Sequence, residues 1–193
     1  PAFAAAFATA TQPFVAALLD AAGVGTGTRV LDLACGTGVV AAAAAARGAV
    51  PTGLDFSPAM LAEAHTAHPG IAFVEGDAEA LPWPDGSFDA VVANFGVHHV
   101  PRPTLALAEA HRALRFGGRF AFSFWAGHAE NIAWKLVFDA VRRCGGPTAA
   151  SGAPPPGGGF GTTAQCLDAL REAGFGALES RRERHICRRR CQF

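Results

Sequence analysis

Residues 29–38, RVLDLACGTG, join an apolar run to a glycine turn. Val30, Leu31 and Leu33 supply the β-branched and apolar run that is typical of a buried parallel strand. Gly36 and Gly38 then end that strand. A strand that ends in a glycine turn and opens a helix is where α/β folds bind nucleotides. Residues without a Cβ let the chain turn tightly and let a ligand approach the backbone N–H groups at the amino end of the helix. The stretch therefore predicts an α/β fold with a nucleotide site.

A second apolar run, residues 50–55, ends at Asp55. At the end of a parallel strand, a carboxylate can accept hydrogen bonds from both hydroxyls of a ribose. Asp55 therefore predicts that the ligand carries a ribose.

The identity of the nucleotide depends on the charge beside the turn. Residues 36–41 satisfy G-x-G-x-x-A, the dinucleotide fingerprint, so an NAD(P)-dependent oxidoreductase is one hypothesis. Asp32 opposes it, because a carboxylate just before the turn repels a pyrophosphate and attracts an amino group or a sulfonium. The position of Asp32 favours S-adenosylmethionine over NAD.

Four motifs carry a resemblance to a known family: VLDLACGTG, GLDFSPAML, FVEGDAEALPWPDGSFDAVV and ALRFGGRF. In this order they resemble the class I S-adenosylmethionine-dependent methyltransferases, in particular the ubiquinone and menaquinone biosynthesis C-methyltransferases. The resemblance covers residues 28–126. It implies a Rossmann-like sandwich, in which helices cover both faces of a mostly parallel sheet. It also implies S-adenosyl-L-methionine as cofactor, S-adenosyl-L-homocysteine as product, and methyl transfer to a carbon, oxygen or nitrogen of a small molecule.

The resemblance further implies which residues bind the cofactor. Phe56 and Met60 lie where the family packs the adenine ring, with core packing as the alternative for Met60. Asp77 lies where the family's acidic residue accepts a hydrogen bond from the adenine amine, with a solvated loop position as its alternative. The predicted cofactor-binding residues are Asp32, Ala34, Gly36, Gly38, Asp55, Phe56, Met60, Asp77, Ala78 and Asn94.

Methyl transfer from a sulfonium is an in-line displacement with an activated leaving group, so the protein mainly aligns the reactants and excludes water. A base is needed only if the acceptor must lose a proton. His98 and His99 follow the predicted strand 88–94 and are the candidate catalytic residues. Adjacent side chains diverge, so at most one is expected to face the pocket, and a capping or core role is the alternative. His128 is a weaker candidate.

The other elements follow from apolar periodicity and from glycine and proline signals. Predicted helices cover residues 1–24, 37–47, 103–114 and 129–144, one begins at Pro58 behind Ser57 as N-cap, and a last one is capped by Thr162 or Thr163 and ends at Ala173. Predicted strands after the first cover residues 50–55, 71–75, 88–94 and 119–125, and a sixth begins at Gly174 and Phe175.

The 193 residues predict a single domain. Its expected parts are a helical cover over the cofactor (1–27), the cofactor-binding core (28–126), a helix with a Gly/Pro-rich flexible loop (127–161), and a last helix, strand six and basic tail (162–193). Class I methyltransferases end in an antiparallel seventh strand beside strand six, for which this chain leaves no room. We therefore expect an incomplete C-terminal hairpin, with cofactor affinity kept and turnover poor. A catalytically silent S-adenosylmethionine-binding module or fragment is the alternative hypothesis.

Composition restricts the environment. Half of the residues are apolar, yet none of the apolar runs approaches the roughly 20 residues of a membrane span. The start at Pro1 shows no secretory signal and implies processing or a fragment. Five scattered cysteines, an odd number, indicate free thiols in a reducing cytoplasm. We therefore expect a cytoplasmic location.

The basic C-terminal tail is the main charge asymmetry. Six arginines and Glu183 give residues 181–193 a charge of +5, and the neutral total leaves residues 1–180 at −5. Without interleaved aromatic residues or a recognition-helix pattern, this tail does not predict a nucleic-acid partner. His185, Cys187 and Cys191 lack a fourth ligand, so no metal site is predicted. The expected partner is a small-molecule methyl acceptor, and the oligomeric state is left open.

Overall fold

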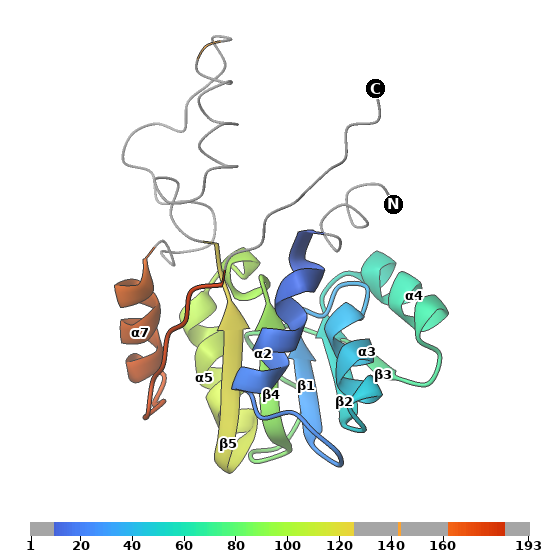
Figure 1. The fold of residues 1–193 in the computed structure, drawn as a ribbon, viewed down its shortest axis with the longest axis horizontal. Helices are drawn as coiled ribbons and strands as arrows, with labels where there is room; N and C mark the ends of the chain where they lie inside the picture. Colours follow the sequence, from blue (N-terminus) through green and yellow to red (C-terminus); the bar gives the residue numbers. More distant parts are fainter. Residues whose placement is uncertain (1–9, 126–142, 144–161, 184–193) are drawn as a thin grey trace.

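A five-stranded parallel sheet organises the molecule (Figure 1). The computed structural model describes residues 10–125, 143 and 162–183. Within them the strand order is β3-β2-β1-β4-β5. The strands are β1 (Arg29–Leu33), β2 (Val50–Asp55), β3 (Ala72–Glu75), β4 (Phe88–Asn94) and β5 (Leu114–Ser123). This topology confirms the predicted α/β class and its mostly parallel sheet.

Helices cover both faces of the sheet, as predicted. In the described residues they are η1 (Gln12–Phe14), α2 (Val15–Ala21), α3 (Val39–Ala46), α4 (Pro58–Ala67), η2 (Val97–His99), α5 (Pro103–Ala113) and α7 (Thr163–Glu172). Val30 in β1 packs with α2 and α3, whereas Leu31 and Leu33 pack with α5 and α7. The alternation along the strand thus divides the core into two layers, one on each side of the sheet.

Helix starts match the local sequence signals. Ser57 Oγ accepts a hydrogen bond from the backbone N–H of Met60 at 3.4 Å, and Pro58 occupies the first helical position of α4. Thr162 caps α7 in the same way, accepting from the backbone N–H of Gln165. These caps confirm the predicted beginnings of both helices.

Strand β5 begins earlier than predicted. Leu114 pairs with Phe88, and the register then shifts so that Arg119 pairs with Ala90. The residues between 114 and 119 bulge away from the ladder, and Gly117 adopts a φ of +74° there. A glycine pair inside a strand suits a bulge as well as it suits a turn. The residues between the predicted helix 103–114 and the predicted strand 119–125 therefore form an irregularity within β5.

The predicted sixth strand is absent from the described residues, which show no strand between 162 and 183. Gly174 has a φ of +95° and Ala177 a φ of +28°, and neither value is compatible with an extended strand. Instead, the Phe175 ring stacks on Phe120 of β5 with centroids 5.3 Å apart. The segment thus anchors α7 to the core without joining the sheet. The predicted helix 129–144, apart from residue 143, and the predicted loop 145–161 lie outside the described residues, as does the tail from 184 onward.

Two further predictions concern thiols and membranes. Cys35 and Cys166 are the two cysteines in the described ranges, and both are buried free thiols. The described helices include none that is long and apolar enough to cross a membrane. Within the same residues, no group of three or more potential metal ligands gathers, and His185, Cys187 and Cys191 lie outside them.

Candidate functional site

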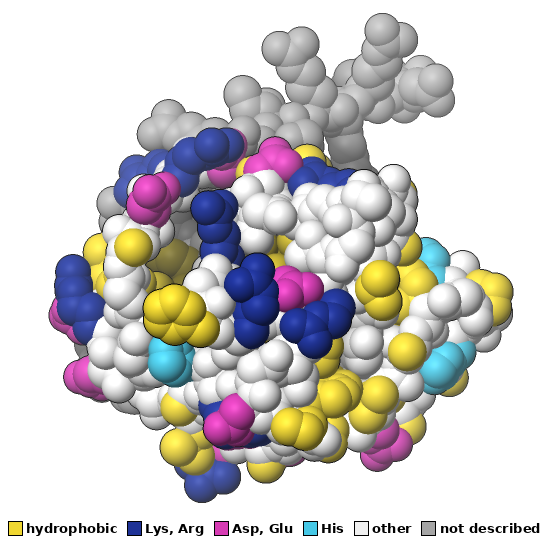
Figure 2. Space-filling view, turned by 90° about the horizontal axis from the view of Figure 1, so that it is seen from below, with side chains coloured by type: hydrophobic (Ala, Val, Ile, Leu, Met, Phe, Trp, Pro, Cys, Tyr) yellow, Lys and Arg dark blue, Asp and Glu magenta, His cyan; other side chains and the backbone are white. Residues whose placement is uncertain are grey.

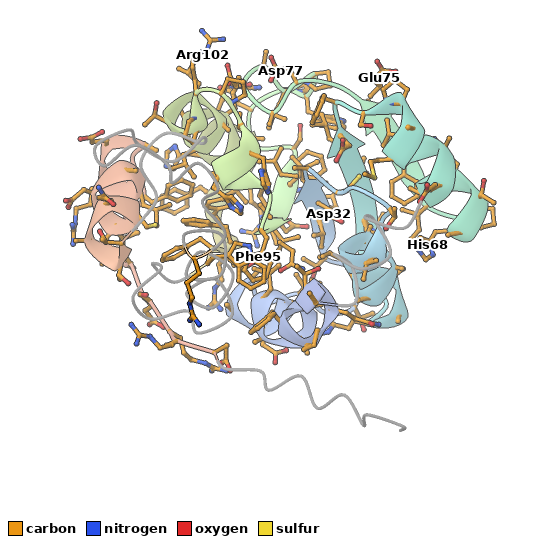
Figure 3. All side chains as sticks on the ribbon, turned by 90° about the horizontal axis from the view of Figure 1, so that it is seen from above. Asp32, His68, Glu75, Asp77, Phe95 and Arg102 are labelled. Atoms are coloured by element: carbon orange, nitrogen blue, oxygen red, sulfur yellow. The ribbon has the colours of Figure 1, made fainter. Side chains whose placement is uncertain are left out.

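The predicted site residues gather at the carboxyl edge, the edge of the sheet where its parallel strands end. Figure 3 looks onto this edge, with Asp32 and Phe95 near its centre and Asp77 at the rim. Asp32 belongs to β1, Phe95 directly follows β4, and Asp77 lies in the loop that follows β3. In an open parallel sheet, the crevice outside these strand ends is the usual ligand site.

Asp55 joins the glycine turn to the start of α4. The residue is only 6% exposed, and the two oxygens of its carboxylate accept hydrogen bonds from different backbone groups. Oδ2 accepts from the N–H of Gly36 at 2.8 Å, and Oδ1 accepts from the N–H of Ser57 at 2.9 Å. A carboxylate has about four lone-pair sites, so both oxygens keep capacity for a further donor. The predicted ribose acceptor is therefore held in a defined orientation.

The two glycines of the turn make room for different neighbours. Gly36 has a φ of +54°, and a Cβ added there would meet nothing within 4 Å. Gly38 has a φ of +80°, and a Cβ there would lie 2.6 Å from Cζ of Phe73. Space for a ligand therefore lies beside Gly36, whereas the missing side chain of Gly38 makes room for Phe73. Gly53 also makes room for Phe73, because a Cβ added at Gly53 would lie 2.5 Å from Cδ1 of that ring.

Asp32 is buried beneath the turn. It is 1% exposed, and its Oδ2 accepts a hydrogen bond from the N–H of Ala41, in the first turn of α3, at 3.0 Å. Burial raises the pKa of Asp32 to about 7, and the Ala41 hydrogen bond opposes that rise. The carboxylate thus satisfies a backbone N–H in the first turn of α3. Any attraction between Asp32 and a cationic ligand therefore acts across the glycine turn.

Backbone strain concentrates at the same edge. Ala34 and Phe95 have φ values of +57° and +55°, although neither is glycine, and they follow the adjacent strands β1 and β4. A Cβ added at Gly96 would lie 2.7 Å from Cβ of Ala34, so the two strand ends approach closely. Left-handed non-glycine residues are uncommon, and they cluster at ligand sites. The strain points to this edge independently of the motifs.

Asn94 belongs to a hydrogen-bond network that joins three segments. Its Oδ1 accepts from Ser123 Oγ at 2.7 Å, and its Nδ2 donates to the Thr11 carbonyl at 3.4 Å. Ser123 Oγ in turn accepts from the N–H of Phe95 at 2.9 Å. Asn94, which is predicted to bind the cofactor, therefore also has a structural role, because it connects β4 to β5 and to the N-terminal segment.

The residues expected around the adenine lie near Asp55 and at the rim. Phe56 is 77% exposed directly after the buried Asp55, and Met60 is half-buried on α4. Asp77 is exposed and its Oδ1 accepts from the N–H of Glu79 at 2.8 Å, while Ala78 is buried. Phe56 thus offers an apolar face to a flat ring at the mouth of the site.

The histidine pair occupies the short helix η2 after β4. His98 is half-buried, and its Nδ1 has no hydrogen-bond partner among the residues that the structure describes. The His99 ring is exposed, with its centroid 4.1 Å from that of His98. Burial first, and His99 second, lower the pKa of His98 to about 4. His98 is therefore neutral at neutral pH and a weak base. His128 lies outside the described residues.

An aromatic cluster at the carboxyl edge was not predicted from the sequence. Phe95 stacks on Trp125 with ring centroids 4.1 Å apart, and Phe14 meets Phe95 edge-on at 5.5 Å. The three rings come from η1 and from the residues after β4 and β5. An apolar residue at each strand end was the available signal, but only the tertiary structure shows that these rings meet.

A family model described as a methyltransferase domain matches residues 31–122. This range extends from β1 into β5 and includes every predicted cofactor-binding residue as well as His98 and His99. Residues 31–122 belong to this methyltransferase domain family. The finding confirms the resemblance that the four motifs indicated, and it gives no support to an oxidoreductase.

Two curated relatives share the methyltransferase domain. Demethylmenaquinone methyltransferase of Beutenbergia cavernae is 48% identical over 103 residues, which cover 53% of this chain and 43% of the relative. The ubiquinone/menaquinone biosynthesis C-methyltransferase UbiE of Methylobacterium nodulans is 51% identical over 100 residues, which cover 48% of this chain and 40% of the relative. The matches thus span less than half the length of these relatives.

Solved structures share the fold of the methyltransferase domain. A Bacillus halodurans protein solved as a candidate methyltransferase has a TM-score of 0.64 and 28% identity, covering 83% of this chain and 68% of that one. The [4+2]-cyclase SpnF has a TM-score of 0.66 and 25% identity, covering 84% of this chain and 56% of that one. Because the same fold occurs in a cyclase, the likeness supports the architecture more strongly than the reaction.

Proposed function

We propose that this chain binds S-adenosyl-L-methionine at the carboxyl edge and transfers its methyl group to a small-molecule acceptor. The observation that carries the proposal is the oriented carboxylate of Asp55 beside the open face of Gly36. Both residues lie inside the range that matches the methyltransferase domain. A ribose placed against Asp55 would lead the rest of an adenosyl ligand past the backbone of the glycine turn.

The residues present fit an adenosyl ligand. The free lone pairs of Asp55 suit the ribose hydroxyls, and the exposed ring of Phe56 suits the adenine face. Asp77 is proposed to accept a hydrogen bond from the adenine amine, and the backbone N–H of Ala78 to donate one to the ring. Met60 is proposed to pack beside the adenine. The full proposed cofactor set is Asp32, Ala34, Gly36, Gly38, Asp55, Phe56, Met60, Asp77, Ala78 and Asn94.

The sulfonium cofactor supplies an already activated methyl group when it is bound. The chain must then align the acceptor and keep water away from the reacting atoms. Phe14, Phe95 and Trp125 are suited to exclude water from the edge because their rings pack on one another. His98 or His99 is proposed to take the acceptor's proton where one must leave. A neutral His98 with a low pKa suits an acidic acceptor hydroxyl better than a weakly acidic carbon.

The names of the relatives suggest the acceptor class. Demethylmenaquinone methyltransferase and the ubiquinone/menaquinone biosynthesis enzyme are named for quinone chemistry. We propose that the acceptor of this chain is a quinone-type ring as well. The cytoplasmic location inferred from the cysteine pattern stays a prediction, and so does the absence of a nucleic-acid partner.

Calorimetric titration with S-adenosyl-L-homocysteine tests the cofactor site. Asp55→Asn keeps the shape of the side chain but removes the charge that strengthens its hydrogen bonds to a diol, each worth about 1.5–3 kcal/mol. We expect the affinity to fall at least about tenfold in a variant that is still folded at the titration temperature. Its melting temperature should also fall, because the amide NH2 cannot accept from the backbone N–H that one carboxylate oxygen bound. Asp168→Asn on the exposed surface of α7 is the matched control and should bind like the parent. Equal affinity of Asp55→Asn and the parent, or preferred binding of NADH, would contradict the proposed site.

Methyl transfer is tested separately from binding. Soluble naphthohydroquinones without the ring methyl group serve as acceptors, and the methylated product is detected by mass spectrometry. Product formation that is lost in the Asp55→Asn variant supports the proposed methyltransferase activity. Tight binding of S-adenosyl-L-homocysteine without transfer to any acceptor would instead support the silent cofactor-binding module.

A further inference from the structure

The opposite edge of the sheet, where the parallel strands begin, carries a cluster of arginines. Figure 2 looks onto this amino edge, and its centre shows Lys/Arg side chains around an acidic one. Arg29 and Asp89 lie at the starts of the neighbouring strands β1 and β4, and Arg115 and Arg119 lie on β5. The seven residues of β4 place this edge about 20 Å from the carboxyl-edge site, at about 3.3 Å per residue.

A polar hollow of about 460 Å³ opens at this edge. Its wall consists largely of glycines and of Thr26 and Thr28, joined by Asp89, Arg115 and Arg119. Gly27 has a φ of +76°, and a Cβ added there would meet nothing within 4 Å. The absence of side chains at the glycines lets a ligand approach the backbone closely.

Asp89 is saturated with donors from two arginines. Its Oδ2 accepts from the backbone N–H and from Nε of Arg29, at 2.9 and 3.2 Å. Its Oδ1 accepts from Nη2 of Arg29 at 3.2 Å and from Nε of Arg115 at 2.6 Å. Hydrogen bonds from Arg29, chiefly from its side chain, hold the pKa of Asp89 well below its usual range. Three arginines against one ionised carboxylate leave the cluster with a net charge of +2.

Arg119 is the arginine of this cluster that does not donate to Asp89. Within the described part of the chain it forms no hydrogen bond or ion pair, and it is exposed. A Cβ added at Gly23 would lie 3.3 Å from its Nη1, so the group lies against the glycine wall of the hollow. An unengaged guanidinium offers five donors in a planar fork that matches phosphate geometry.

We propose that this hollow binds a phosphate dianion carried by a small phosphorylated metabolite. Arg119 and the remaining donors of Arg115 hold the phosphate oxygens. The hydroxyl of Thr28, whose oxygen accepts from the N–H of Gly25, donates its proton to complete the contacts. The net charge of +2 balances a phosphate dianion, and guanidinium–phosphate pairs are among the stronger hydrogen bonds in proteins. The site is separate from the carboxyl edge and does not depend on the proposed methyl transfer.

Opposite changes in two variants test the site. Binding of inorganic phosphate and diphosphate is measured by amide chemical-shift titration at constant ionic strength, with chloride as the reference anion. Arg119→Gln removes the free fork, and we expect the affinity to fall at least about tenfold. Asp89→Asn removes the competing charge and releases Arg29 and Arg115, so we expect the affinity to rise several-fold. Arg171→Gln, on the exposed face of α7, is the matched control and should change nothing.

The contrary results are equally specific. Phosphate binding that Arg119→Gln leaves unchanged, or that Asp89→Asn weakens in a folded protein, would overturn the site. Vesicles of phosphatidic acid and of uncharged phosphatidylcholine distinguish the source of the phosphate. Binding to phosphatidic acid vesicles that depends on Arg119, together with no binding of free phosphate or diphosphate, would assign the hollow to a lipid headgroup and overturn the metabolite proposal.

Discussion

Gly36 and Gly38 are two residues apart in one turn, yet their missing side chains leave room for different groups. The open side of Gly36 faces free space, while the space at Gly38 is taken by the ring of Phe73 and by His68. Gly27 shares a positive φ but lies on the opposite edge of the sheet. These three positions allow the effect of backbone strain to be separated from the effects of packing and of ligand approach.

We therefore predict three different outcomes for valine substitutions. Gly27→Val should lose about 1–2 kcal/mol of stability from its left-handed backbone and bind S-adenosyl-L-homocysteine like the parent. Gly36→Val should lose a similar amount and also bind at least about tenfold more weakly. Gly38→Val should be the least stable, because its side chain clashes with Phe73. Thermal unfolding and calorimetric titration check all three, and normal binding by Gly36→Val would remove the turn from the site.

Asp32 makes stability depend on pH in an unusual direction for a carboxylate. Its pKa is raised from 3.8 to about 7, chiefly by burial, so the folded protein holds the proton more tightly than the unfolded chain does. Between about pH 4 and pH 7 the folded state thus binds more protons at this residue, and its contribution to stability falls as the pH rises. Above about pH 7 both states are ionised there and the loss is complete.

Asp32→Asn should abolish this pH dependence. The amide has no charge to bury, and its oxygen still accepts from the N–H of Ala41. We expect the free energy of unfolding of the variant, minus that of the parent, to increase from pH 4.5 to pH 7.5, because only the parent loses stability at this residue as the pH rises. Urea unfolding at several pH values measures that difference, in which the titration of the other groups cancels. A constant difference across the range would show that Asp32 is ionised throughout.

At the scale of elements, Arg112 of α5 holds the loop between β3 and β4. Its guanidinium donates to the carbonyls of Leu81 and Trp83 and to the carboxylates of Asp85 and Glu109, at 2.7–3.1 Å. Glu109 in turn accepts from the N–H of Leu81 at 2.7 Å. The proline- and glycine-rich sequence predicted a loop, and this network orders it against the helix.

Arg112→Met should release the loop while keeping most of the aliphatic packing of the side chain. We expect a loss of about 1–3 kcal/mol, because partly buried carbonyls and Glu109 lose a charged donor. Hydrogen exchange should increase at the amides of Leu81 and Gly86, whose partners are Glu109 and the Arg112 carbonyl. Arg171→Met removes an exposed ion pair on α7 and should change stability little. Similar exchange at Leu81 in both variants would argue against the network.

At the scale of the whole molecule, Asn94 and Ser123 connect the N-terminal segment to the two strands β4 and β5. The chain reaches this point three times, at Thr11, at Asn94 with Phe95, and at Ser123. The expected helical cover of residues 1–27 stays a prediction with respect to the cofactor. In the described residues, α2 lies along the face of the sheet, with its amino end toward the carboxyl edge (Figure 1).

A double-mutant cycle tests this connection. Asn94→Ala and Ser123→Ala should each cost about 1–3 kcal/mol, because each leaves a partner without its hydrogen bond. The two losses should not add, and we expect a coupling of about 1 kcal/mol in urea unfolding. Asn94→Ala should also weaken S-adenosyl-L-homocysteine binding more than Ser123→Ala does, if the proposed cofactor role holds. Strictly additive losses would show that the two side chains act independently.

The sequence by itself determined the features that depend on neighbouring residues. The glycine turn after β1, the Ser57 cap, the apolar strand runs and the acidic residue that ends β2 are local signals, and the structure contains each of them. The gathering of the predicted site residues at the carboxyl edge also followed, because parallel strands all end at one edge. The family motifs lie in this same range and needed no tertiary information.

Only the tertiary structure decided which groups meet across the chain. It placed Phe73 against Gly38 and buried Asp32 under α3. It also packed Phe175 on β5 in place of a sixth strand and brought the rings of Phe14 and Phe95 into contact. It also gathered arginines from β1 and β5 around Asp89. A local pattern specifies backbone preference and burial, whereas contacts between distant segments depend on how the helices and strands pack together. For that reason the sequence predicted which residues end their strands at the carboxyl edge, but the contacts of each side chain became visible only in the fold.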